Sequence, residues 1–102
     1  MQEAIKQIAD HYGYQHQRKK LIEEMAELTV EICHLDERGN YEEFEQRQGV
    51  YEEIADVEVV LEQIKYLLNC EDEVEVLKQY KVRRQLDRMK EQGGYDGCES
   101  LS

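Results

Sequence analysis

Apolar residues recur at spacings of three and four along most of the chain, which places them on one face of an α-helix. This pattern predicts two long helices over residues 15–37 and 47–69, with a shorter helix over 2–11 before them and a fourth helix over 72–92 after them. The apolar positions of the two long helices are Leu21, Met25, Leu28, Ile32 and Leu35 in the first, and Val50, Ile54, Val57, Val60, Leu61, Ile64, Leu67 and Leu68 in the second.

Residues that begin or end helices separate these segments. Gly13, between two tyrosines, ends the short first helix, and a Gly-Asn pair at residues 39–40 ends the second. Asp72, followed three residues later by Glu75, resembles a capping box that starts the fourth helix. A Gly-Gly pair ends that helix, so we expect a disordered tail over residues 93–102.

The composition also favours helix. The chain has 102 residues, no proline and one phenylalanine, and it is rich in the unbranched residues that keep their rotamer freedom in a helix. We therefore expect an all-α fold with no sheet, forming one domain over residues 1–92. Two long antiparallel helices with shorter flanking helices enclose little core in a domain this small. A homodimer or homotetramer that completes a helical bundle is expected.

Charge and cysteine content limit the binding partners and the cellular compartment that we expect. There are 24 acidic and 13 basic residues, a formal net charge of −11, which disfavours nucleic acid and anionic membranes as partners. Cys33, Cys70 and Cys98 are odd in number and widely spaced, so they predict reduced thiols and not a disulfide framework or a zinc site. The sequence shows no signal peptide and no apolar run of about 20 residues. A soluble, cytoplasmic protein is expected.

One carboxylate is placed where a charge is unfavourable. At about 100° per residue, Glu53 projects from the middle of the apolar face of the helix over 47–69, among Val57, Val60 and Ile64. An ionised carboxylate at such a position must be protonated, ion-paired or bound to a cation. Asp56, one turn further, offers a second oxygen ligand for the same ion. The alternative is a buried salt bridge to a basic residue of a neighbouring helix.

The first long helix carries a matching acidic row. Glu24, Glu27 and Glu31 follow the i, i+3, i+7 spacing and border its apolar face, where like charges repel unless they share a cation. Across an antiparallel hairpin these carboxylates face Glu53 and Asp56. A set of oxygen ligands suits a hard cation, and magnesium in particular shares its coordination sphere with substrate phosphates. The pattern therefore indicates phosphate chemistry.

The acidic residues also match a family signature. Glu23-Glu24-Met25-Ala26-Glu27, followed after 25 residues by Glu53-Ile54-Ala55-Asp56, resembles the EExxE…ExxD signature of MazG-like all-α nucleoside triphosphate pyrophosphohydrolases. The resemblance covers about residues 12–90 and implies a MazG-like helical bundle.

This resemblance implies an activity and a set of site residues. The reaction is hydrolysis of a (deoxy)nucleoside triphosphate to the monophosphate and pyrophosphate, with Mg²⁺ as cofactor and Mn²⁺ as a substitute. Glu24, Glu27, Glu53 and Asp56 are the expected metal ligands, and Glu23 and Glu27 are the catalytic candidates. Glu23 is expected either to support the metal ligands or to help orient the attacking water. The general base, the number of metal ions and the preferred base and sugar stay open.

Basic and polar residues supply candidates for substrate binding. Lys81, Arg84 and Arg88 share one face of the helix over 72–92, and they are expected either to clamp the terminal phosphates or to pair with the acidic helix. Lys20 and Gln17 lie one and two turns before Glu24, respectively, and are expected within reach of base or phosphate.

Further residues have two readings. Tyr12 and Tyr14 either stack on a base or cover the end of the bundle. Glu31 and His34 form an E-x-x-H pair, which is compatible with a carboxylate-bridged di-metal bundle. The second alternative is a non-enzymatic oligomeric helical adaptor, in which the carboxylates serve solubility and pairing.

Overall fold

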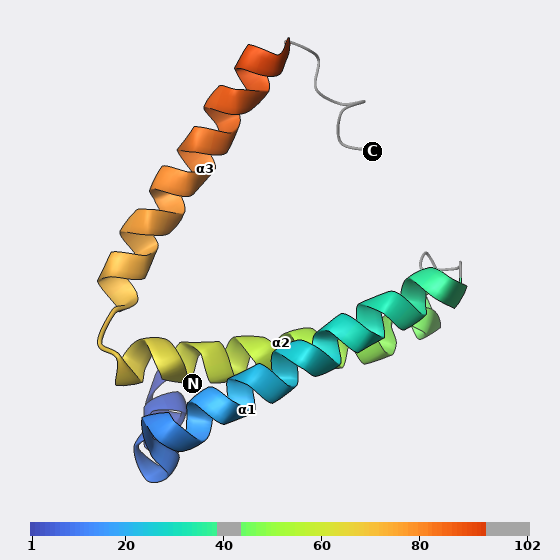
Figure 1. Cartoon of the computed structure of the whole chain (residues 1–102). Coiled ribbons are helices and arrows are strands. Elements are labelled where there is room, and N and C mark those ends of the chain that lie inside the picture. Colours follow the sequence, from blue (N-terminus) through green and yellow to red (C-terminus); the bar gives the residue numbers. More distant parts are fainter. Residues whose placement is uncertain (39–43, 94–102) are drawn as a thin grey trace. The chain divides into compact units, whose positions relative to one another are not determined.

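The computed structural model describes residues 1–38 and 44–93. These residues form three helices, α1 (Gln2–Arg38), α2 (Phe44–Leu67) and α3 (Glu71–Gly93), and no strand occurs among them (Figure 1). The prediction of an all-α fold is confirmed. The chain divides into two units, Met1–Asn69 and Cys70–Ser102, which are described separately below. The predicted tail, apart from residue 93, lies outside the described residues, as does the predicted helix end at residues 39–40.

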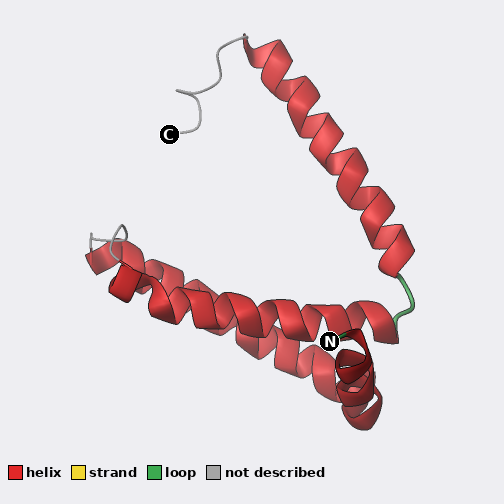
Figure 2. Ribbon diagram, turned by 180° about the vertical axis from the view of Figure 1, so that it is seen from behind, coloured by secondary structure: helices red, strands yellow, loops and turns green. Residues whose placement is uncertain are grey.

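The first unit is an antiparallel hairpin. Figures 1 and 2 both show α1 and α2 lying side by side along their length. The unit has a small apolar core, because only four apolar residues count as buried among the described positions; they are Ala9, Leu35, Val50 and Val60. Several large apolar side chains stay exposed on these two helices, as the sequence predicted for a hairpin too small to enclose them.

The predicted break between the first two helices is a kink inside α1. Both predicted segments belong to α1, but Gly13 between them has φ 83° and ψ 168°, far from helical values. This region of conformational space is open essentially to glycine alone. The segment before the kink packs on the end of α2, where Tyr66 Oη donates to the Asp10 carboxylate at 3.0 Å and Lys6 lies 5.7 Å from the Tyr66 ring centre.

Helix α3 begins one residue earlier than the sequence predicted. α2 ends at Leu67, and Asn69 adopts the left-handed conformation (φ 55°) common after helix ends. The backbone N–H of Val74 then donates to the Cys70 carbonyl at 2.9 Å, and α3 starts at Glu71. The prediction that Asp72 caps this helix is therefore wrong. Asp72 lies inside the first turn, where its charge interacts favourably with the helix dipole.

Charge is ordered along α3. Its first turn holds Glu71, Asp72 and Glu73, and its last turn holds Lys90, the arrangement that the helix dipole favours. Apolar side chains on α3 are also exposed; the large ones are Val76, Leu77, Tyr80, Val82, Leu86 and Met89. Within the described part of the chain, no helix has the length and apolar character needed to cross a membrane.

Candidate metal centre

Three carboxylates from the two helices of the hairpin come together. Glu24 and Glu27 lie one turn apart on α1, and Glu53 reaches them from α2. One carboxylate oxygen from each residue lies within 4.8 Å of the corresponding atoms of the other two. The burial of the three side chains is graded, because Glu24 is buried, Glu53 is half-buried and Glu27 is exposed. The cluster therefore has a buried end and an end open to solvent.

Glu24 is the buried member, with 6% of its surface exposed. Its Oε2 forms an ion pair with Lys20 Nζ at 3.1 Å, one turn earlier on α1. The hydrogen bond to Lys20 holds the pKa of Glu24 below its ordinary value, and the same contact raises the pKa of Lys20. The second oxygen, Oε1, is buried without a hydrogen-bond partner. Glu24 thus keeps a charged, buried acceptor available to a further cation.

Glu53 has the opposite electrostatic character. Burial raises its pKa to about 6, and the negative charges of Glu27 and Asp56 add to the rise. Its Oε1 is buried without a hydrogen-bond partner, and none of the three ion pairs found among the described residues includes Glu53. The salt bridge considered as an alternative from the sequence is therefore not seen in the described part of the chain. A cation would relieve the repulsion that raises this pKa.

The other predicted acidic residues lie outside the three-carboxylate cluster. Asp56 is exposed on α2, and it bears on the site through the effect of its charge on Glu53. Glu23 is exposed on α1 and is likewise not a member of the cluster. Ligation by Asp56 and a catalytic role for Glu23 stay predictions.

Gln17 is buried in the interface between α1 and α2, with 4% of its surface exposed. Its Nε2 donates to Gln63 Oε1 at 2.7 Å, and His16 Nδ1 donates to Gln17 Oε1 at 2.6 Å. The amide is thus engaged within the hairpin, while its predicted contact with substrate stays untested. Sequence reasoning missed Gln63, which is 2% exposed. Its position three residues after buried Val60 was the available signal.

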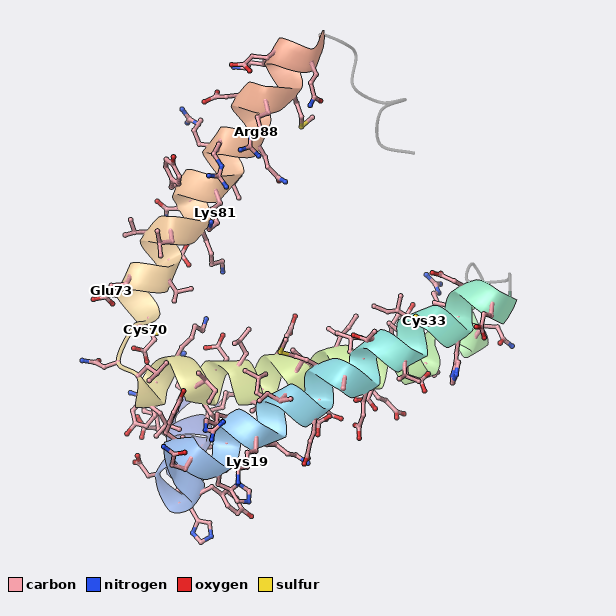
Figure 3. The ribbon with its side chains drawn as sticks, in the orientation of Figure 1. Lys19, Cys33, Cys70, Glu73, Lys81 and Arg88 are labelled. Atoms are coloured by element: carbon pink, nitrogen blue, oxygen red, sulfur yellow. The ribbon has the colours of Figure 1, made fainter. Side chains whose placement is uncertain are left out.

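The predicted basic strip lies on α3. Lys81, Arg84 and Arg88 are exposed at the i, i+3 and i+7 positions of one continuous helix and so share a face, and two of them are labelled in Figure 3. The Arg84 guanidinium lies 5.5 Å from the centre of the Tyr80 ring, within the range of a cation–π interaction. The strip is thus presented to solvent on the second unit.

The remaining candidates are arranged as follows. Tyr12 stacks on His16, with ring centres 4.6 Å apart, so an imidazole already lies against that aromatic face. Tyr14 is partly exposed. His34 is exposed, and neither His34 nor Glu31 belongs to a group of potential metal ligands within the described residues.

The donor set fits a hard cation. All three side chains of the cluster offer carboxylate oxygens, which hard divalent cations prefer over nitrogen or sulfur donors. The unpartnered oxygens of Glu24 and Glu53 point to the same conclusion, because buried polar atoms in folded proteins are rarely left without a partner. We find no match for this chain among protein-family models, curated proteins or solved structures.

Proposed function

We propose that this chain is a magnesium-dependent nucleoside triphosphate pyrophosphohydrolase of the MazG-like kind. The observation that carries the proposal is the convergence of Glu24, Glu27 and Glu53 from two antiparallel helices, with an unpartnered oxygen on a buried glutamate. The order and spacing of these residues in the sequence resemble the MazG-like signature, and this resemblance is the basis for the proposed reaction.

The reaction breaks the bond between the α-phosphorus and the oxygen that bridges to the β-phosphorus. Glu24, Glu27 and Glu53 would hold Mg²⁺, with Asp56 as the fourth predicted ligand. Bound magnesium supplies neutralisation of phosphate charge and polarisation of a phosphoryl oxygen. Glu27 is the exposed member of the cluster, so its carboxylate meets bulk water and would accept a proton from the attacking water. Pyrophosphate leaves, and the nucleoside monophosphate carries the new oxygen.

Lys20 has a role of its own in this proposal. Its ammonium stays about half-exposed while it neutralises one oxygen of buried Glu24. A metal ion would take over that neutralisation, and the flexible lysine side chain would then be able to bind a substrate phosphate. Gln17 supports the same helix by its buried bond to Gln63. Phosphate binding by the basic strip of α3 stays a prediction from the sequence.

Turnover of a glutamine variant tests the metal centre. Glu53→Gln keeps the volume of the side chain but removes its charge, so it should abolish magnesium-dependent pyrophosphate release from a panel of NTPs and dNTPs. Glu52→Gln is the matched control, because it makes the same charge change at the adjacent, exposed position. Near-normal turnover by Glu53→Gln in a folded protein would remove Glu53 from the site.

Product identity tests the reaction separately. Cleavage at the α-phosphorus yields pyrophosphate and a monophosphate, whereas cleavage at the γ-phosphorus yields orthophosphate and a diphosphate. Chromatography of a single turnover mixture separates the four products. Orthophosphate with a nucleoside diphosphate as the primary products would refute the pyrophosphohydrolase assignment even if the reaction needs magnesium.

A second copy of the chain is the proposed partner of the hairpin. Both helices present exposed apolar side chains at helical spacing, namely Ile22, Met25 and Ile32 on α1 and Ile54 and Leu61 on α2. Apolar surface of this kind on a small hairpin favours burial against another helical hairpin. Light scattering should give a dimer or tetramer, and Met25→Glu should shift the protein toward monomer.

A further inference from the structure

A surface hollow adjoins the carboxylate cluster. It has a volume of about 420 Å³ and is lined by Ala26, Glu27, Val30, Glu31 and Glu53. Glu27 and Glu53 also belong to the cluster, so the hollow opens directly beside the proposed metal centre. A ligand whose phosphate binds at the cluster would therefore place its neighbouring group in this hollow, whose size is within the range of small-molecule sites.

The lining combines an apolar surface with carboxylates. Ala26 and Val30 lie one turn apart on α1, and both are exposed. Glu27 and Glu31 follow them at the adjacent positions. A flat ring has apolar faces and a polar edge, so it can lie on Ala26 and Val30 while its edge meets a carboxylate. An ionised carboxylate accepts hydrogen bonds and donates none, so it favours an amino group at that edge and disfavours a carbonyl oxygen.

Glu31 is the carboxylate that is free for this role. It is not one of the three carboxylates whose oxygens lie within 4.8 Å of one another. Within the described residues, no hydrogen bond or ion pair occupies it. The negative charge of Glu31 would repel a phosphate but would accept a hydrogen bond from an amino group of a base. Glu31 would therefore bind a different part of the nucleotide than the cluster does.

Gly49 on α2 leaves space for the Glu31 carboxylate. A Cβ atom added to Gly49 would lie 3.0 Å from Glu31 Cδ and would overlap Oε1. The carboxylate thus lies against the backbone of α2 in a space that any other residue would fill. Glycine is unfavourable inside a helix, by about 1 kcal/mol relative to alanine, but its lack of a Cβ atom permits this close approach.

We propose that this hollow is the nucleoside subsite and that Glu31, seated against Gly49, selects bases that carry an exocyclic amino group. The inference rests on the proposed function, because the cluster must first hold the triphosphate. It assigns a substrate class, amino-bearing nucleotides such as those of cytosine and adenine, in preference to keto counterparts such as those of uracil and hypoxanthine.

Kinetics with matched substrate pairs test the assignment. The pairs dCTP with dUTP and dATP with dITP exchange an amino group for a carbonyl oxygen at one ring position. The wild-type protein should prefer the amino member in kcat/KM by about ten- to a hundredfold, the usual range for a hydrogen bond to a charged group. In Glu31→Gln the preference should fall to within about threefold, because the amide both donates and accepts.

Gly49→Ala supplies a test that leaves Glu31 itself unchanged. The added methyl group must displace the carboxylate, so the preference for the amino member should fall in the wild-type background. In the Glu31→Ala background the same substitution should leave the ratio unchanged, since no carboxylate remains to be displaced. Glu58→Gln, an exposed charge change elsewhere on α2, is the control and should keep the wild-type ratio.

The outcomes separate the two proposals. Hydrolysis of none of the NTPs and dNTPs of the panel by the wild-type protein overturns the proposed function and this inference with it, whereas hydrolysis of other nucleotides but none of these four overturns the inference alone. Hydrolysis with equal kcat/KM for both members of each pair overturns the inference alone. So does a preference that survives Glu31→Gln, or an effect of Gly49→Ala that persists without Glu31.

Discussion

The buried glutamate of the cluster allows a quantitative test of metal binding by stability. Glu24→Gln preserves the size of the side chain and an acceptor for Lys20, but it removes the charge beside the unpartnered oxygen. Without metal the change should be small, within about 0.5 kcal/mol, because the lost ion pair involves a lysine that is about half-exposed. The interpretation therefore depends on the response to magnesium and not on the metal-free melting temperature.

The expected response follows from mass action. At a magnesium concentration of 100 times the Kd, binding to the folded state alone stabilises a protein by about 2.7 kcal/mol. For a domain of this size, about 4–8 °C of melting temperature corresponds to each kcal/mol. The wild-type shift should therefore be on the order of 10–20 °C. If the loss of the Glu24 charge weakens magnesium binding ten- to a hundredfold, the stabilisation by magnesium at the same concentration falls to roughly 0.4–1.4 kcal/mol.

Thermal melts followed by circular dichroism, with magnesium and with a chelator, provide the measurement. Glu58→Gln is the control, because it removes one exposed charge from α2 at a position outside the cluster and should keep the full shift. The reasoning is refuted if Glu24→Gln responds to magnesium as the wild-type protein does, or if Glu58→Gln loses as much of the response. A wild-type protein indifferent to magnesium would instead favour the adaptor interpretation.

Three further predictions concern other residues. Because the pKa of Glu53 is raised to about 6, its ionisation destabilises the metal-free fold. Acidification from pH 7.5 to pH 5 should therefore raise the melting temperature of the wild-type protein relative to that of Glu53→Gln. Thermal melts in the presence of a chelator measure this difference. Gln63→Leu leaves the Gln17 amide unsatisfied in the helix interface and should lower the free energy of unfolding by about 1–3 kcal/mol in urea denaturation. Arg84→Gln should weaken binding of a triphosphate about ten- to a hundredfold and of the monophosphate far less, measured by calorimetry; equal losses would place Arg84 away from the terminal phosphates.

Local patterns in the sequence were sufficient for the helices. Apolar spacing gave both long helices to within a few residues, because helical periodicity depends on neighbours three and four positions apart. The break at Gly13 was also predictable, since glycine alone takes its backbone conformation without strain. The start of α3 was misplaced by one residue because the capping pattern at Asp72 competed with an equally acidic first turn.

The candidate metal centre was also predicted only in part from the sequence. That Glu53 faces the apolar side of its helix followed from periodicity. The expectation that a carboxylate there is protonated, ion-paired or bound to a cation followed from electrostatics. Which carboxylates actually meet was decided by the register of α1 against α2. The register brings Glu24 and Glu27 to Glu53 and leaves Asp56 outside that group.

Three features belong to the tertiary structure alone. The pairing of Gln17 with Gln63 joins residues 46 positions apart, and the contact of Glu31 with Gly49 depends on two helices approaching closely at one point. The unpartnered oxygen of Glu24 is likewise defined only once the hairpin has closed over it. Spacing along one helix fixes which side chains share a face, but the atoms that a face meets depend on the axial offset between helices, which no local pattern encodes.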